Sequence, residues 1–266
     1  MSRPTTPFTA VVLAGDRSSG DPVARAAGVR SKSLIPVGGT PMVLRVIDAL
    51  ESAREIEGVV LCGPDKSAVD QEQELRLRIG SGKVKWLESQ TTPSSSTYYA
   101  MQSLSDSAPV LVTTADHALL TAEMVNYFCS GVRKSDKDVV VGLVLHELVT
   151  AQYPETKRTA IQLADGSYCS CNLFGFLTPE ARSAAYFWRK VESQRKKTLR
   201  VIAGFGWLNL LRYVLKRPSL EQGLGQISQR LGLRAGAVVM PFPEAAVDVD
   251  TVSDWKLVES ILANRT

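Results

Sequence analysis

A glycine and a group of basic residues follow the first apolar segment of the chain. Residues 8–14 (FTAVVLA) form a short apolar run, and Gly15 comes directly after it. A glycine at the end of a strand lets backbone N–H groups approach a phosphate closely. Basic residues follow at positions 17, 25, 30 and 32. This composition fits a polyphosphate clamp, and it fits a solvated basic surface loop equally well.

Two acidic residues follow apolar segments at distant places in the chain. Residues 109–115 (PVLVTTA) lead into Asp116, and residues 246–249 (AVDV) lead into Asp250, with Asp248 as the alternative acid. In open α/β sheets, ligands bind beyond the carboxyl ends of the strands. Asp116 is therefore expected at a ligand site. The D-x-D-T sequence before a helix also fits simple helix capping.

Strands and helices that could position these residues alternate in the first half of the chain. Alternation of this kind predicts an α/β fold with a mostly parallel sheet and helices on both faces, in three layers. We expect strands over 8–14, 58–62, 83–87, 109–114 and 138–145, and helices over 42–53, 66–79, 93–104 and about 122–132.

The second half of the chain has a different pattern. Residues 158–177 predict two short strands around the Asp165-Gly166 turn. Helical segments follow over roughly 180–232, then strands over 236–240 and 246–250 and a closing helix from Ser253. No internal repeat or low-complexity linker separates the halves. We therefore predict a single domain over 1–266 with a largely helical insertion at about 178–235.

Four stretches of the chain resemble the signature of a known family. VVLAGDR at 11–17, followed by KSLIPVGGTPMV at 32–43, is similar to the L-A-A-G-x-G-x-R and P-K-x-L-x-P-V-x-G-x-P-M motifs of MobA-like nucleotidyltransferases. These belong to the molybdopterin-nucleotide and sugar-nucleotide pyrophosphorylase superfamily. Residues 109–119 and 246–255 resemble its two acidic motifs. Asp16 and Ser31 depart from the pattern, as does the missing proline after Asp116. The resemblance implies a Rossmann-like, GT-A-type sheet.

The resemblance also implies roles for individual residues. It assigns 1–150 to nucleotide binding and 151–266 to the acceptor side. Lys32, Arg17 and Asp116 are the implied catalytic residues, and Asp116 and Asp250 the implied Mg²⁺ ligands. Asn172 is the implied acceptor contact, with a β-bulge asparagine as the alternative. The implied nucleotide-binding residues are Leu13, Ala14, Gly15, Arg17, Lys32, Ser95, Ser96 and Asp116, although Ser95 and Ser96 also fit a plain capped helix.

The reaction implied by the resemblance is transfer of a nucleoside monophosphate from a nucleoside triphosphate. The acceptor is a phosphorylated small molecule or a lipid-linked phosphate, and pyrophosphate leaves. By analogy, CTP is the first expectation for the donor and GTP the second. A glycosyltransferase of the same fold type is disfavoured because Ala118 stands where a second acid is usual. A non-catalytic, nucleotide-binding regulatory relative is also compatible with the altered first loop.

The charge of the chain is uneven. The net charge is +4, but residues 189–217 contain nine basic residues and one acid, which gives +8 there and −4 elsewhere. Such a segment suggests an anionic partner, either the acceptor or a membrane surface contacted peripherally, or it covers a solvent-facing helix. No nucleic-acid-binding module is recognised, so no nucleic acid is expected. The lack of an 18-residue apolar run or a signal-peptide layout predicts a cytoplasmic protein.

Overall fold

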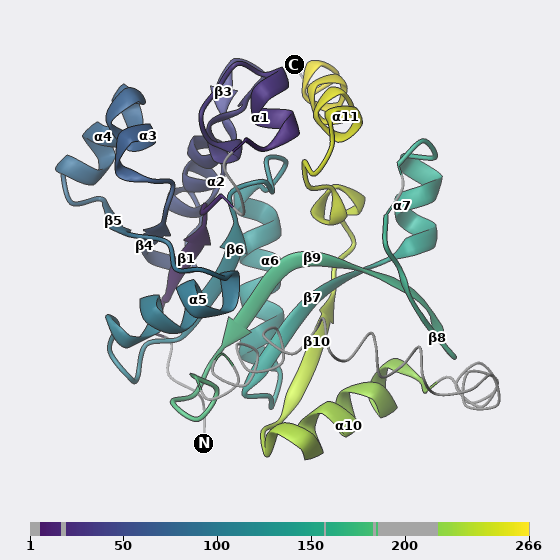
Figure 1. Cartoon of the computed structure of the whole chain (residues 1–266). Coiled ribbons are helices and arrows are strands. Elements are labelled where there is room, and N and C mark those ends of the chain that lie inside the picture. Colours follow the sequence, from purple (N-terminus) through teal and green to yellow (C-terminus); the bar gives the residue numbers. More distant parts are fainter. Residues whose placement is uncertain (1–5, 17–19, 157, 183–184, 186–217, 266) are drawn as a thin grey trace, which may run out of the picture.

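A mostly parallel sheet forms the centre of the molecule. The computed structural model describes residues 6–16, 20–156, 158–182, 185 and 218–265. Within these residues the main sheet has eight strands, in the order β10-β7-β9-β6-β1-β4-β5, with β8 paired to β9 (Figure 1). The strands are β1 (Phe8–Leu13), β4 (Ile56–Cys62), β5 (Val84–Leu87), β6 (Val110–Thr114), β7 (Val139–Leu145), β8 (Ile161–Leu163), β9 (Gly166–Phe176) and β10 (Ala235–Val239).

The relative directions of the strands follow the two patterns expected from the sequence, a mostly parallel sheet in the first half and a pair of strands around a turn in the second. β1 pairs in parallel with β4 and β6, and β7 pairs in parallel with β10. The long strand β9 runs antiparallel to β6, β7 and β8. The β8–β9 hairpin closes at the predicted Asp165-Gly166 turn, where Gly166 has a φ of 147°.

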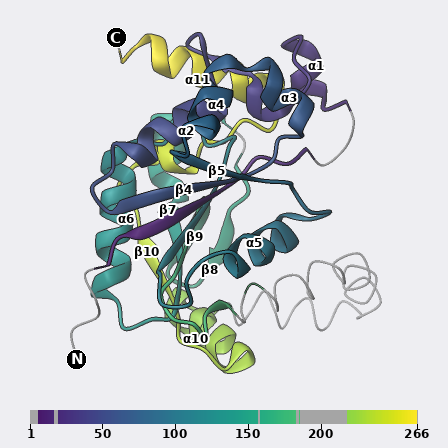
Figure 2. The same cartoon turned by 90° about the vertical axis from the view of Figure 1, so that its left-hand side faces the viewer.

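Helices cover both faces of the sheet. α2 (Met42–Glu51) and α6 (Ala122–Lys134) lie on one face, and α5 (Pro93–Gln102) lies on the other (Figure 2). Alternate residues of β1 are buried in different hydrophobic clusters, with Ala10 and Val12 in one and Val11 in the other. This explains why β1 is a continuous apolar run rather than an alternating one. The three-layer prediction is confirmed.

Three local predictions differ from the structure. The helix expected over 66–79 is two helices, α3 (Lys66–Gln71) and α4 (Gln73–Gly80), because Glu72 has an extended backbone between them. A helix that was not predicted, α7 (His146–Gln152), follows β7 directly. Of the helical segments expected over 180–232, the structure describes α10 (Leu220–Leu231), and 186–217 lie outside the described residues.

The strand predicted over 246–250 is wrong. Residues Pro243–Ala246 form a short 3₁₀ helix, η2, and the chain then continues extended without a strand partner in the described sheet. Val247 and Val249 are fully buried, but against a hydrophobic cluster outside the sheet. The apolar alternation that suggested a strand therefore reflects burial of this segment under the last helix, α11 (Val252–Ala263).

The segment after β1 packs against the end of the chain. It contains α1 (Pro22–Ala26), the 3₁₀ helix η1 (Lys32–Leu34) and the β2–β3 hairpin (Pro36–Val37, Thr40–Pro41). Both its hairpin and α11 lie at the end of the molecule where α1 is also found (Figure 1). The Trp255 indole N–H donates to the Pro36 carbonyl at 2.9 Å, and the Glu259 carboxylate accepts from Gly38 N–H at 3.1 Å. These contacts hold two segments that are distant in sequence side by side.

None of the helices in the described part of the chain is long and apolar enough to cross a membrane.

Candidate active site

Lys32 brings the two predicted acidic positions together. Its ammonium nitrogen, Nζ, lies 2.6 Å from Oδ2 of Asp116 and 2.7 Å from Oδ1 of Asp250. Lys32 is the first residue of η1, and Asp116 lies just after the end of β6. Asp250 comes directly before Thr251, the residue that caps α11. The structure thus assembles one cation and two carboxylates from three segments at the carboxyl ends of the parallel strands.

The charges of this cluster stabilise one another. Burial opposes the charge on Lys32, but Asp116 and Asp250 outweigh it and raise the pKa of the ammonium group to about 12. Burial would also raise the pKa of the Asp116 carboxyl, yet the Lys32 ammonium group holds that pKa below its ordinary value. The second carboxylate oxygen of Asp116, Oδ1, is buried without a hydrogen-bond partner among the described residues. This buried oxygen therefore keeps capacity to accept a bond that the Lys32 ammonium group does not use.

Asp250 is held by its own loop. Thr251 caps α11, and Asp254 closes a capping box with it. Oδ2 of Asp254 accepts from the backbone N–H groups of Thr251 at 2.8 Å and Asp250 at 3.2 Å. Asp254 therefore serves the N-terminus of α11. The Asp250 side chain is still 58% exposed, so it can face a ligand from solvent.

The loop after β1 and the lysine segment are joined through Asp16. Its Oδ1 accepts from the backbone N–H of Lys32 at 3.0 Å. The residue that departs from the family pattern therefore has a structural partner in the second half of the same signature. Arg17, the other predicted cation of this loop, lies outside the described residues.

A small pocket opens beside the end of β1. It is lined by residues from the ends of β1 and β4 and from the segment that enters α5: Leu13, Gly15, Asp16, Cys62, Gln90, Thr91, Thr92, Pro93 and Ser96. Glycine is required at two positions here. A Cβ on Gly15 would lie 2.6 Å from Ser89 Cβ, and one on Gly63, whose φ is +81°, would lie 2.9 Å from Gly15 N. At Gly63 the neighbouring backbone leaves no room for a side chain, and at Gly15 the Ser89 side chain occupies the space that a Cβ would need.

The two predicted serines of α5 have different places. Ser96 lines the pocket, and its hydroxyl accepts from Gln90 N–H at 2.8 Å, which shapes the wall. Ser95 is not among the lining residues, and its N–H is bound by Thr92, the residue that caps α5 in place of the expected serine. Ser96 thus belongs to the wall of this pocket, whereas Ser95 contributes to the helix start.

Asn172 contacts Asp248, the alternative acid, rather than the cation site formed by Lys32, Asp116 and Asp250. Its Nδ2 donates to Oδ2 of Asp248 at 3.0 Å, and its φ is +51° beside a register shift between β7 and β9. The expected bulge geometry is present. Arg158 donates to the same Asp248 carboxylate. Asp248 therefore faces β9 and the segment before β8, and Asp250 is the acid that meets Asp116 at Lys32.

Arg158 and the pocket segment 90–93 were not predicted from the sequence. Arg158 stands in an ordinary polar stretch with no spacing signal, so only its contacts show its importance. Residues 90–93 precede the predicted α5, and their closeness to Gly15 depends on sheet order.

His117 is the most buried ionisable group at the site. It is 1% exposed, and neither ring nitrogen has a hydrogen-bond partner among the described residues. Burial, with a contribution from Arg158, lowers its pKa to about 4, against the opposing effect of Asp116. The imidazole is therefore neutral near pH 7 and carries no charge toward a phosphate.

The donor set fits a magnesium ion in part. Mg²⁺ binds carboxylate oxygens and usually completes its shell with water and substrate phosphates. The unpaired Asp116 Oδ1 and the exposed Asp250 carboxylate offer such oxygens. In the described part of the chain no group of three or more acidic, histidine or cysteine side chains could hold a metal alone. The residues therefore suit a metal that arrives with a polyphosphate.

Comparison with known proteins identifies the family of this chain. The chain belongs to the family of MobA-like NTP transferase domains, whose sequence model matches residues 10–162. A hypothetical transferase from Thermus thermophilus has a TM-score of 0.74 and 30% identity, over 94% of this chain and 99% of that one. The predicted nucleotidyltransferase class is thereby confirmed. The comparison with curated proteins gave no match.

Two more distant structures share the fold. A CMP:2-keto-3-deoxy-manno-octonic acid synthetase complexed with CTP has 12% identity and a TM-score of 0.56, over 97% of this chain and 100% of that one. A 2-C-methyl-D-erythritol 4-phosphate cytidylyltransferase from Thermus thermophilus has 14% identity and a TM-score of 0.55, over 97% and 99%. At these identities the likeness concerns the fold alone.

Proposed function

We propose that this protein is a magnesium-dependent nucleotidyltransferase that transfers CMP from CTP to a phosphorylated acceptor and releases pyrophosphate. The observation that carries the proposal is the meeting of Lys32, Asp116 and Asp250 beside the pocket at the end of β1. CTP is preferred because the two distant structures are a CTP complex and a cytidylyltransferase. GTP is the second candidate donor.

The arrangement supports in-line attack on the α-phosphorus. The Gly15 backbone and Asp16 would lie beside the nucleotide, and Lys32 would neutralise the charge that develops on the phosphates. Asp116 and Asp250 would hold Mg²⁺, which supplies charge neutralisation and orientation of the phosphate oxygens when bound. A phosphate monoester has a second pKa of about 6, so it is already a nucleophile near pH 7 and needs no strong base. The neutral His117 agrees with this.

The acceptor would approach from the side of β9. Asn172 and Asp248 face that side of the cation site. A phosphorylated acceptor is supported by the name of one distant structure, which includes an erythritol 4-phosphate. Residues 189–217, which carry the basic charge, lie outside the described residues.

The first experiment measures thermal stability with ATP, CTP, GTP and UTP, each with and without Mg²⁺. A ligand at 100 times its Kd adds about 2.7 kcal/mol of stability. We expect Mg²⁺-dependent stabilisation by CTP that is lost in Asp116→Asn. Pyrophosphate release with a panel of phosphorylated alcohols and sugars then identifies the acceptor.

Each other outcome points to a different function. Stabilisation without pyrophosphate release for any acceptor supports a regulatory nucleotide-binding protein. Stabilisation by a nucleotide sugar but by no triphosphate supports a glycosyltransferase and contradicts the proposal.

A further inference from the structure

Arg158 connects the segment between α7 and β8 to the loop that carries Asp250. It lies between α7 and β8, and its side chain is 9% exposed. The guanidinium group donates to the Asp248 carboxylate, to the Asp248 carbonyl at 2.8 Å and to Oδ1 of Asp254 at 3.0 Å. Nε also donates to Thr156 Oγ1 at 3.1 Å. One side chain thus binds the residues at both ends of the stretch 248–254.

These contacts reach Asp250 through Asp254. One oxygen of the Asp254 carboxylate accepts from Arg158, and the other accepts from the backbone N–H of Asp250 at 3.2 Å. On the opposite side, Val249 N–H donates to the Asp116 carbonyl at 3.1 Å. The backbone before Asp250 is therefore held by the Asp116 carbonyl group. The N–H of Asp250 itself is held by Asp254, which Arg158 binds.

Arg158 also offsets the repulsion within this loop. Asp248, Asp250 and Asp254 lie within seven consecutive residues, and Asp116 faces them. Arg158 pairs with the Asp248 carboxylate and with Oδ1 of Asp254 at 3.0 Å, so it places one positive charge between two of these acids. Among the described residues, Lys32 pairs with Asp116 and Asp250, and Arg158 pairs with the remaining two acids, Asp248 and Asp254.

We propose that Arg158 is a positioning residue that sets the geometry of the Asp116–Asp250 cation site. This inference rests on the proposed function, because it assumes that the site holds a divalent metal with a triphosphate. Asn172 acts with Arg158, because both hold the Asp248 carboxylate. The segment between α7 and β8 thereby determines where Asp250, one of the two proposed metal ligands, lies.

A second buried arginine provides a matched control. The side chain of Arg182 is 10% exposed. It donates to the carbonyl groups of Met101, at 2.7 Å, and of Ser105, beyond the end of α5, and pairs with Asp106 at 3.0 Å. Its burial and number of partners resemble those of Arg158, but none of these partners belongs to the candidate site. A loss that is merely structural should appear at both positions.

The test compares Arg158→Gln and Arg158→Lys with Arg182→Gln and Arg182→Lys. Mn²⁺ binding is measured by electron paramagnetic resonance in the presence of CTP and, separately, of GTP, and thermal stability is measured alongside. We expect Arg158→Gln to weaken Mn²⁺ binding about tenfold or more, and Arg158→Lys to retain part of the affinity because it keeps the charge but not the fork. The Arg182 variants should lose stability but bind Mn²⁺ like the wild type.

If Arg158→Gln does not fold, Asp248→Asn replaces it in the Mn²⁺-binding test. It removes one of the acids that Arg158 pairs with, and we expect it to weaken Mn²⁺ binding less than Arg158→Gln. Unchanged Mn²⁺ binding in Arg158→Lys and Asp248→Asn, or equal losses in the Arg158 and Arg182 variants, would overturn the inference and leave the proposed function intact. A wild-type protein that binds no Mn²⁺ with either triphosphate would overturn both.

Discussion

Nζ of Lys32 lies 2.7 Å from Oδ1 of Asp250, although 218 positions separate the two residues in the sequence. The same nitrogen lies 2.6 Å from Asp116. An ammonium group and a divalent cation would repel each other strongly if both lay between these carboxylates. Under the proposed function, Lys32 would be the counter-ion of the nucleotide-free site and would turn toward the triphosphate when a metal ion binds.

Replacing Lys32 by Met should have opposite effects on metal binding and on catalysis. Without nucleotide, Mn²⁺ affinity should rise about tenfold or more, because the two carboxylates lose the cation that competes for them. Turnover should fall by orders of magnitude, because no ammonium group remains to neutralise the phosphates. Isothermal titration with Mn²⁺ and a pyrophosphate-release assay measure the two effects separately.

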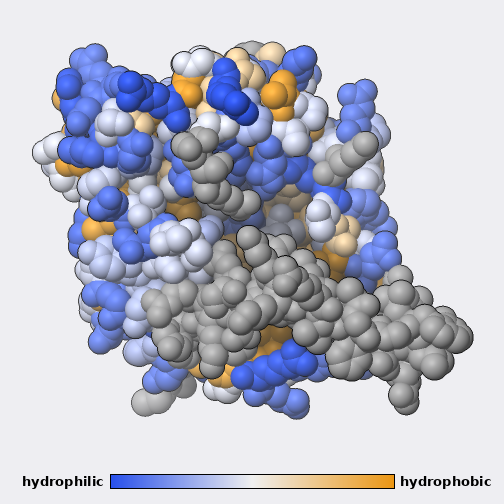
Figure 3. Space-filling model, in the orientation of Figure 1, coloured by the Kyte–Doolittle hydropathy of each residue, from blue (hydrophilic) through white to orange (hydrophobic). Residues whose placement is uncertain are grey.

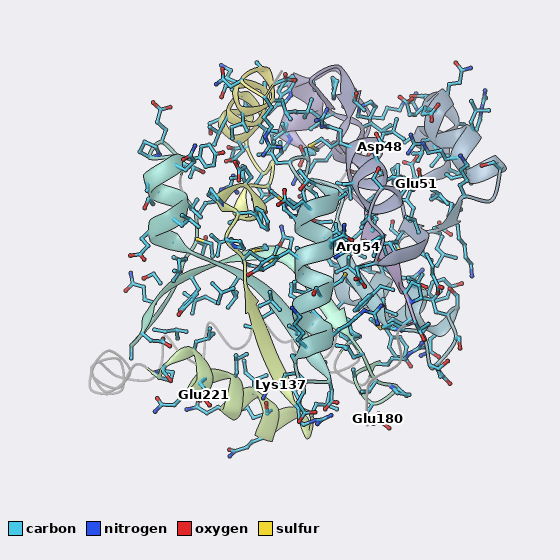
Figure 4. All side chains as sticks on the ribbon, turned by 180° about the vertical axis from the view of Figure 1, so that it is seen from behind. Asp48, Glu51, Arg54, Lys137, Glu180 and Glu221 are labelled. Atoms are coloured by element: carbon cyan, nitrogen blue, oxygen red, sulfur yellow. The ribbon has the colours of Figure 1, made fainter. Side chains whose placement is uncertain are left out.

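Two acid-to-amide variants control this result. Asp250→Asn should lose Mn²⁺ binding, whereas Glu221→Gln should not, because Glu221 lies on α10 at the opposite end of the molecule from α11 (Figure 4). Both remove one negative charge, so they separate a local ligand from the net charge. If Lys32→Met binds Mn²⁺ no more tightly than the wild type, Lys32 does not compete with the metal.

The pocket at the end of β1 should be closed by a single methyl group. A Cβ at Gly15 would lie 2.6 Å from Ser89 Cβ and 2.9 Å from Ser89 Oγ. Relief of that contact must move the backbone that lines the pocket, and overpacking typically costs about 1–3 kcal/mol. Gly15→Ala should therefore weaken CTP binding about tenfold, as measured by thermal titration.

The double variant Gly15→Ala, Ser89→Gly tests the cause of that loss. Removing the Ser89 side chain removes both atoms that the new methyl group meets, so CTP binding should recover in large part. A double variant as weak as the single one would show that Gly15 matters for its backbone conformation or for direct contact with phosphate.

The sequence predicted the elements whose two faces are buried. β1, β4, β6 and β7 are short apolar runs, and their alternation with helices implies a parallel sheet. The segment before α11 was wrongly predicted as a strand, because Val247 and Val249 alternate with polar residues as in a strand. These two side chains are instead buried against α1 and the β2–β3 hairpin. Alternation reports which residues are buried, and it does not report whether the surface that covers them is a sheet.

The site was predictable only where the chain repeats a known spacing. Lys32, Asp116 and Asp250 were found from the signature, and the structure brings them together, while the roles that it implied stay predictions. Arg158 was missed because its importance comes from contacts with Asp248 and Asp254, which lie about 90 positions away. The hollowed centre of the face in Figure 3, below α1 and α11, likewise forms from segments that only the fold brings together.

Asp16 should act through its oxygen and not through its charge. Its Oδ1 accepts from Lys32 N–H, and this bond joins the loop after β1 to η1. Asp16→Asn keeps an acceptor, whereas Asp16→Ala removes it, so only the alanine variant should lose triphosphate affinity, by about fivefold to tenfold. Thermal titration with CTP measures this. Equal weakening in both variants would instead indicate that the carboxylate charge is required.

The burial of His117 makes the stability of the protein depend on pH. Its pKa is lowered from 6.5 to about 4 in the folded protein. A group that is held neutral stabilises the fold fully above its unfolded pKa. That stability is lost as the pH falls from about 6.5 toward 4, because the unfolded chain takes up a proton that the folded chain refuses. The loss at pH 5 is about 2 kcal/mol for one histidine.

His117→Gln should remove this dependence. Glutamine is similar in size and does not titrate, so the variant should be less sensitive to a change from pH 7.5 to pH 5 by about 2 kcal/mol in the free energy of unfolding. Urea unfolding at the two pH values measures the difference, and the other titrating groups cancel because both proteins contain them. An equal loss in the wild type and in the variant would show that the folded protein accepts a proton on His117. The orphaned ring nitrogens would then have a partner that stabilises the charged imidazole.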